Sequence, residues 1–169
     1  LLRGTVREFM NDHNVYITDW HDAGSVPLSD GRFTLNSYVE YLKEYIRYFN
    51  GNVHLMAVCQ PSVPAIAAVA LMSEAQEPVP LSIVRMGGPV DTRKTPTEVN
   101  DFAGQRNIHW FKRHTIHTVP LNRRGRGRSV YPGFLQLAGF LSMNLDRHMT
   151  AHHDYFEHLV SGDGDSATQ

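Results

Sequence analysis

In the N-terminal part of the chain, short apolar runs of strand length alternate with a region whose apolar residues recur with the period of a helix. Residues 53–58 (VHLMAV) and 81–86 (LSIVRM) are apolar runs of strand length. The first of them is nearly continuous, which predicts a strand covered on both faces. Between residues 35 and 49, apolar residues recur at i, i+3, i+4 and i+7, with Thr34 placed to cap a helix and Gly51 placed to stop it. Residues 14–18 (NVYIT) predict a further short strand.

The order of these segments predicts an α/β fold. Pro61 and Pro64 follow the first apolar run and can occupy the first turn of a helix, where a missing N–H costs nothing. Residues 65–72 then supply good helix formers. Strand, sharp turn, helix and strand imply a mostly parallel sheet with right-handed crossovers and flanking helices. Functional residues should gather at the carboxyl ends of its strands.

The C-terminal part has a less regular pattern. Residues 99–111 predict one short helix, residues 122–132 a loop rich in Gly and Arg, and residues 133–160 a broadly helical region with many aromatic residues. The apolar residues of 131–141 are numerous enough to grip a water-insoluble ligand. Core packing explains the same residues without a function, and we expect most of them to be buried.

Composition narrows the range of functions. With 16 Lys and Arg against 17 Asp and Glu, the net charge is −1, so no overall field attracts nucleic acid or an anionic membrane. One cysteine cannot form an internal disulfide, and no signal peptide or membrane-spanning apolar stretch is evident, which favours a reducing, cytoplasmic setting. The first residue is not Met, and residues 161–166 form a polar run, so we expect the chain to be a segment of a longer protein.

Cys59 is the leading candidate for a catalytic residue. It lies between an apolar strand and the helix that Pro61 opens, where a nucleophile elbow holds its side chain on a strained turn. The helix N-terminus favours the thiolate, and the backbone N–H of Gln60 can face a developing oxyanion. Ala57 fits the small residue expected two positions before the nucleophile, but Pro61 departs from the small residue expected two positions after it. From spacing alone, an inert buried thiol is an equal alternative.

The histidines carry a weaker signal. His148 and His152 form an i, i+4 pair on a predicted helix, a spacing that can bind zinc. No clear third ligand stands at metalloenzyme spacing, so a solvated helix face is favoured even with the neighbouring His153, Asp154, Glu157 and His158. His54 is expected to be a hydrogen-bonded histidine of the core. No metal site is predicted.

Two further features have a functional and a structural interpretation. Asp91 follows the second apolar run, where some hydrolases place the acid of a triad, but its neighbour Arg93 and the Gly-Pro turn favour a loop-ordering role. Residues 123–128 (RRGRGR) can bind nucleic acid or phosphate. With balanced total charge, a flexible loop or a salt-bridge patch is favoured.

Residues 57–64 (AVCQPSVP) resemble the cysteine-containing lipase box of the intracellular poly(3-hydroxyalkanoate) depolymerases. Residues 16–23 (YITDWHDA), 86–93 (MGGPVDTR), 130–137 (VYPGFLQL) and 142–148 (SMNLDRH) are similar to further blocks of that family, in the same order. The resemblance is therefore specific and spans nearly the whole chain.

The resemblance implies an α/β-hydrolase in which residues 1–98 form a core segment with the nucleophile elbow and residues 99–169 form a cap or insertion. It implies ester hydrolysis of stored polyhydroxybutyrate by Cys59, with the backbone of Gln60 as an oxyanion donor. The Asp and His of the triad are expected beyond Gln169. The implied partner is the polymer at the surface of a cytoplasmic storage granule, with no cofactor, nucleic acid or membrane required. The sequence does not define the oligomeric state.

Two rival functions remain at this point. A polyhydroxyalkanoate synthase also uses a Cys elbow, but its box normally has glycines around the Cys, and Gln60-Pro61 does not match it. A non-catalytic granule-binding protein with a hydrolase fold is the second rival, and Cys59 in the elbow argues mildly against it.

Overall fold

The computed structural model describes residues 3–94, 97–142 and 145–162. Met143 and Asn144, within the block 142–148, and the end of the polar run from Asp163 onward lie outside the described residues. The chain divides into two compact units, residues 29–106 and residues 1–28 together with 107–169.

The unit of residues 29–106 is built on a strand–helix–strand arrangement. Strands β1 (His54–Val58) and β2 (Ser82–Met86) pair in parallel, with His54 opposite Ser82 and Val58 opposite Met86. Helix α3 (Ser62–Glu74) connects them, and Pro61 and Pro64 stand at its start as predicted. The parallel pairing expected from the order of apolar runs is therefore confirmed.

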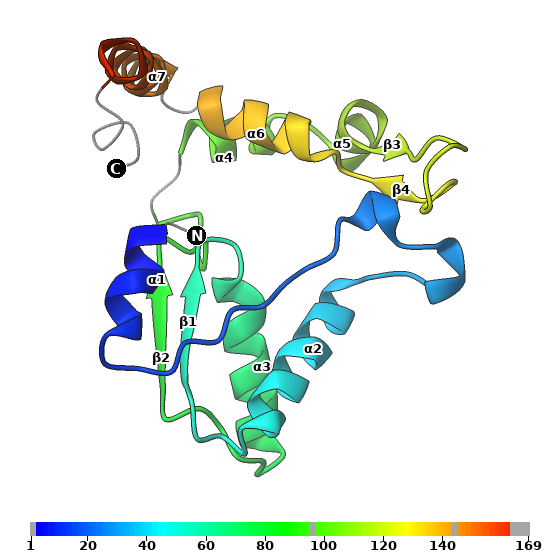
Figure 1. Cartoon of the computed structure of the whole chain (residues 1–169). Helices are drawn as coiled ribbons and strands as arrows, with labels where there is room; N and C mark the ends of the chain where they lie inside the picture. The colour runs from blue at the N-terminus through cyan, green and yellow to red at the C-terminus, as the bar shows by residue number, and fades with distance from the viewer. Residues whose placement is uncertain (1–2, 95–96, 143–144, 163–169) are drawn as a thin grey trace. The chain divides into compact units, whose positions relative to one another are not determined.

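Helix α2 (Leu35–Tyr48) confirms the predicted periodicity and cap. The Thr34 side chain accepts a hydrogen bond from Ser37 N at 3.2 Å, and Ser37 Oγ accepts one from Thr34 N at 3.2 Å, which completes a capping box. Helices α2 and α3 lie on the same side of the two strands in Figure 1. Small alanines on α3 allow this close packing, and the core consists of Val39, Leu42, Ala57, Ala65 and Ala68.

The prediction that β1 is covered on both faces is wrong for the described chain. Ala57 is buried and Leu55 partly buried against the helices, because alternate side chains of a strand point to one face. On the other face Val84 and Met86 of β2 are 45% and 46% exposed, and Val58 of β1 is 38% exposed. Residues 14–18 are not in a strand either, and Tyr16 and Ile17 are 68% and 59% exposed, so a β-prone run without apolar burial forms no third strand.

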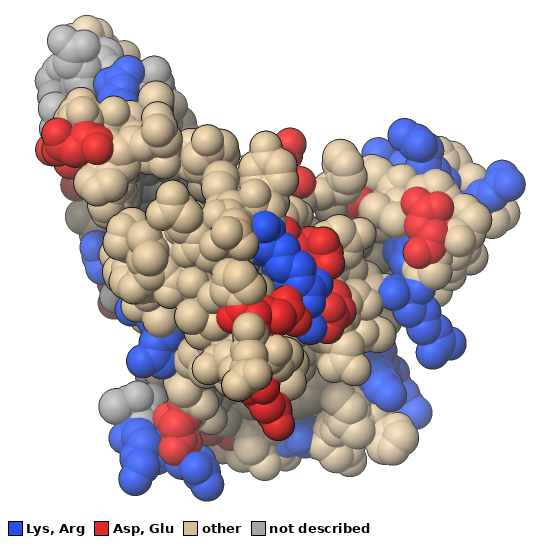
Figure 2. Space-filling model, turned by 90° about the horizontal axis from the view of Figure 1, so that it is seen from below, with Lys and Arg blue, Asp and Glu red and all other residues tan. Residues whose placement is uncertain are grey.

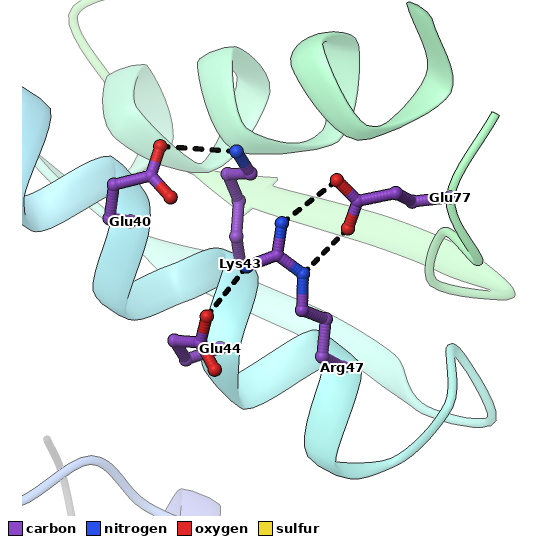
Figure 3. Close-up of polar contacts among 5 residues, drawn as sticks. All are labelled: Glu40, Lys43, Glu44, Arg47 and Glu77. Carbon is purple, nitrogen blue, oxygen red and sulfur yellow. Dashed lines mark hydrogen bonds and ion pairs between the residues drawn. The ribbon is translucent and has the colours of Figure 1, made fainter. Parts of the chain in front are cut away.

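A charged cluster links α2 to the segment after α3 (Figure 3). Arg47 Nε and Nη2 donate to the two carboxylate oxygens of Glu77 at 2.6 and 2.8 Å, and Arg47 Nη1 donates to Glu44 at 2.6 Å. Hydrogen bonds from Arg47 hold the pKa of Glu77 below its usual range. Lys43 pairs with Glu40 at 3.1 Å on the same helix. Opposite charges are thus neutralised locally in this cluster. On the face shown in Figure 2, Lys and Arg also lie beside Asp and Glu, among uncharged residues.

The predicted single helix over 99–111 is two helices. Helix α4 (Glu98–Gly104) ends before Asn107, whose side chain accepts from Trp110 N at 2.9 Å and so caps α5 (Ile108–Thr115). Asn is a preferred capping residue because its side-chain oxygen satisfies a free N–H of the first turn. The break therefore has a local cause at Asn107.

The unit of residues 1–28 and 107–169 contains short elements and, besides α5, the helices α1, α6 and α7. Helix α1 (Arg3–Met10) and the 3-10 turns η1 (Ala23–Ser25) and η2 (Leu28–Asp30), which spans the boundary at residue 28, were not predicted. Strands β3 (His117–Thr118) and β4 (Ser129–Val130) form an antiparallel pair. Helices α6 (Gly133–Ser142) and α7 (Leu145–Ser161) agree with the helical pattern expected for 133–160.

The apolar residues of 131–141 are more exposed than predicted. Phe134 and Leu137 on α6 are 70% and 58% exposed, and Tyr131 and Phe140 are also exposed, so the expectation that most of this stretch is core is wrong for the described chain. Leu135 and Leu141 are only partly buried. A complete α/β-hydrolase fold, and its division into a core at 1–98 and a cap at 99–169, stay predictions.

Candidate active site

Cys59 lies in the turn between the carboxyl end of β1 and the N-terminus of α3. It is the only cysteine of the chain and is partly accessible. Its φ of 66° places it in the left-handed region, which costs a non-glycine residue about 1–2 kcal/mol. The strained turn expected for a nucleophile elbow is therefore present, and such strain is concentrated at functional sites.

Backbone hydrogen bonds define this turn on both sides. Cys59 N donates to Met86 O at the end of β2 at 2.7 Å, and Cys59 O accepts from Ser62 N at 3.0 Å. The exposed Gln60 accepts from Val63 N at 3.3 Å through its carbonyl, and within the described ranges its own N–H has no hydrogen-bond partner. This N–H next to the thiol is therefore free to donate a hydrogen bond to an oxyanion.

The strain at Cys59 leads to a stability prediction. Glycine adopts a positive φ without steric cost, so Cys59→Gly is expected to have a free energy of unfolding about 1 kcal/mol higher than Cys59→Ala. Urea unfolding followed by circular dichroism measures both. Gln76, with φ 56° at the end of α3, is the matched control away from the thiol, and Gln76→Gly should likewise exceed Gln76→Ala. Equal stability of the two Cys59 variants would contradict a strained turn.

Asp91 is held in its own loop. It accepts from Arg93 Nε at 2.8 Å, from Arg93 Nη2 at 2.9 Å and from Arg93 N at 3.1 Å. These hydrogen bonds lower the pKa of the Asp91 carboxyl. The loop-ordering role predicted for Asp91 is confirmed by this geometry.

The histidines do not lie in the environments that the sequence predicts. His54 has the expected partner, Ser82 Oγ at 2.8 Å from its Nδ1, but it is exposed, so its placement in the core is wrong. On α7 the ligand atoms that gather within 4.8 Å belong to His153, Asp154 and Glu157, not to the pair His148 and His152. All three are exposed, and His153 Nδ1 lies 3.7 Å from Glu157 Oε1. This agrees with a solvated helix face.

The arginine-rich loop is ordered by backbone contacts. Gly125 N donates to Gly24 O at 3.0 Å, and a Cβ at Gly125 would lie 2.5 Å from that oxygen. Arg128 Nε donates to Val26 O at 2.9 Å, and its Nη2 donates to Pro27 O. No ion pair among the described residues involves this loop, so the salt-bridge patch is not observed. Arg128 instead holds the backbone of Val26 and Pro27.

The strand–turn–helix with a strained cysteine defines a candidate nucleophile site, and comparison with known families gives it a context. Residues 87–169 match the family model described as PHB de-polymerase C-terminus. The match covers 83 of the 169 residues, slightly less than half of the chain. Cys59 lies outside the matched residues.

No curated protein and no solved structure matches the chain significantly. Within the residues that the structure describes, no helix is both long and apolar enough to cross a membrane.

Proposed function

We propose that this chain carries the nucleophile of an α/β-hydrolase that cleaves ester bonds of stored polyhydroxyalkanoate. The match of residues 87–169 to the PHB de-polymerase C-terminus is the observation that carries the proposal. The strained turn at Cys59 supports the choice of nucleophile, because its position after β1 and before α3 suits an elbow.

The proposed reaction is acyl transfer through a thioester. A histidine takes the proton of the Cys59 thiol, and the thiolate attacks the ester carbonyl carbon. A C–S bond forms, and the carbonyl electrons move to oxygen, where the N–H of Gln60 donates a hydrogen bond. The tetrahedral intermediate then expels the alkoxide, which takes a proton from the histidine. Water deprotonated by that histidine hydrolyses the thioester and releases the acid.

The proposal assigns the histidine and its aspartate to residues beyond Gln169. Asp91 does not serve as the acid, because the observed hydrogen bonds of its carboxylate are all with Arg93 of its own loop. The mechanism requires no metal or organic cofactor.

The partner is the surface of a cytoplasmic polymer granule. Exposed apolar side chains suit a water-insoluble polyester better than charge does. Helix α6 presents Phe134 and Leu137, and α7 presents Met149 and Phe156, all more than half exposed and all within the matched residues.

One pair of incubations tests the function. The full-length protein is incubated with amorphous polyhydroxybutyrate and, separately, with 3-hydroxybutyryl-CoA. Release of 3-hydroxybutyrate or its oligomers from the polymer is expected. Polymer growth from the CoA ester would instead identify a synthase, and binding to the polymer without either reaction would identify a granule-binding protein.

A further inference from the structure

The left-handed conformation of Cys59 needs support from its surroundings. A non-glycine residue at φ 66° persists only where neighbouring contacts determine the backbone. On its N-terminal side, the hydrogen bond from Cys59 N to Met86 O provides one such contact at 2.7 Å. The contacts on the other side come from two residues to which the sequence pattern assigned no role.

Ser62 is the first of these residues. It is fully buried at the start of α3, its Oγ donates to Ala57 O at 3.2 Å, and its N donates to Cys59 O at 3.0 Å. The residue therefore ties the end of β1 to the beginning of α3 across the nucleophile turn. Buried hydroxyls that bridge backbone segments in this way restrict both segments.

Gly88 is the second residue. A Cβ at this position would lie 2.2 Å from both Cβ and Oγ of Ser62 and 3.1 Å from Cys59 O. Gly88 has no positive φ, so space and not backbone conformation requires glycine here. Its neighbour Gly87 shows the opposite case, with φ 61° and nothing within 4 Å of an added Cβ. The segment after β2 thus packs directly on the backbone and side chain that shape the Cys59 turn.

We infer that Ser62 and Gly88 are positioning residues that hold Cys59 in its reactive orientation. The inference rests on the proposed role of Cys59 as nucleophile. Neither residue needs to touch the substrate, so their loss should lower kcat with little change in KM. A displacement of about 1 Å at a reacting group can cost about 10²-fold in rate.

The first test substitutes each residue and measures polymer hydrolysis by the full-length protein. Gly88→Ala is expected to lower kcat by about 10²-fold, because the added Cβ must displace a buried side chain. Ser62→Ala removes only the hydroxyl and is expected to lower kcat by about tenfold, as estimated from the loss of one buried hydrogen bond. Gly104→Ala, where an added Cβ meets nothing within 4 Å, and the exposed Ser73→Ala of α3 are matched controls that should keep wild-type kcat.

A second readout uses the thiol itself. Iodoacetamide alkylation of the full-length protein is followed by mass spectrometry on the peptide that contains Cys59, so it reports on this one thiol. Gly88→Ala and Ser62→Ala should change the alkylation rate at neutral pH relative to the rate at alkaline pH, whereas the two controls should not. A loss of general stability would not produce this selective change in folded protein.

The pairing of the two residues gives the sharpest comparison. Ser62→Gly removes both atoms that the new Cβ would meet at 2.2 Å, so it should restore much of the kcat that Gly88→Ala loses. Ser62→Ala combined with Gly88→Ala keeps the serine Cβ position and should not restore it. If Gly88→Ala alone does not fold, the Ser62→Ala variant and the Ser62→Gly, Gly88→Ala double variant still test the positioning role of Ser62 and Gly88.

The outcomes separate this inference from the proposed function. Wild-type kcat and alkylation rates in Ser62→Ala and Gly88→Ala, or equal kcat for the two double variants, would overturn the positioning role alone. Wild-type hydrolysis by Cys59→Ala would overturn the proposed function, whatever the other variants do.

Discussion

Replacing Cys59 by alanine should abolish polymer hydrolysis and leave the fold intact. The substitution removes the atom that forms the acyl bond, and loss of a catalytic nucleophile typically costs a factor of at least about 10⁴ in kcat. Only a partly accessible sulfur is lost, so the free energy of unfolding should change little. Release of 3-hydroxybutyrate from amorphous polymer, measured for the full-length protein, tests the rate, and urea unfolding tests the fold.

Two comparisons make this result specific. Cys59→Ser should keep only a trace of activity, because a hydroxyl can accept the same base but is far less ionised at neutral pH. Ser73→Ala on the exposed side of α3 should behave as wild type. Turnover of Cys59→Ala above a small fraction of the wild-type rate would exclude Cys59 as nucleophile.

The second large effect concerns the 169-residue chain by itself. We expect it to hydrolyse neither polymer nor small esters, because the proposed acid and base lie beyond Gln169. Without them the thiol lacks the groups that deprotonate it and protonate the leaving alkoxide, a loss of about 10⁴-fold or more. The exposed Val84 and Met86 of the parallel sheet also predict low stability for the isolated chain, since parallel sheets are normally covered on both faces.

A short-chain p-nitrophenyl ester provides the assay, and the protein extended beyond Gln169 provides the positive control. The extended protein should turn over the ester, and the 169-residue chain should not exceed background. Turnover by the short chain that Asp91→Asn or His148→Ala removes would place the acid or the base within this chain and refute their assignment to later residues.

The helices α2 and α3 and the strand β1 could be predicted because local signals agreed there. The apolar spacing of α2 coincides with the Thr34 cap, and Pro61 stands where a helix can begin. The break at Asn107 was not predicted, although Asn is a common capping residue. Residues 14–18 are typical of a strand, but a strand also needs a neighbouring strand to pair with, and a run of five residues does not show whether one is present.

Only part of the candidate site could be predicted from the sequence. The strained turn at Cys59 follows from local order, since a strand, a cysteine and a proline-initiated helix leave few backbone conformations between them. The contact of Gly88 with Ser62 joins residues separated along the chain by all of α3 and β2, so only the folded structure reveals it. Burial of the apolar residues on α6 was mispredicted because apolar spacing does not show what covers a helix face.

Trapping the acyl-enzyme identifies the nucleophile directly. The full-length protein is mixed with 3-hydroxybutyrate oligomers, quenched with acid during turnover, digested and analysed by mass spectrometry. A hydroxylamine-labile 3-hydroxybutyryl group is expected on the peptide that contains Cys59, and no such group is expected in Cys59→Ala. An acyl group on a different residue, or polymer hydrolysis that continues in Cys59→Ala, would contradict the assignment of Cys59 as the nucleophile.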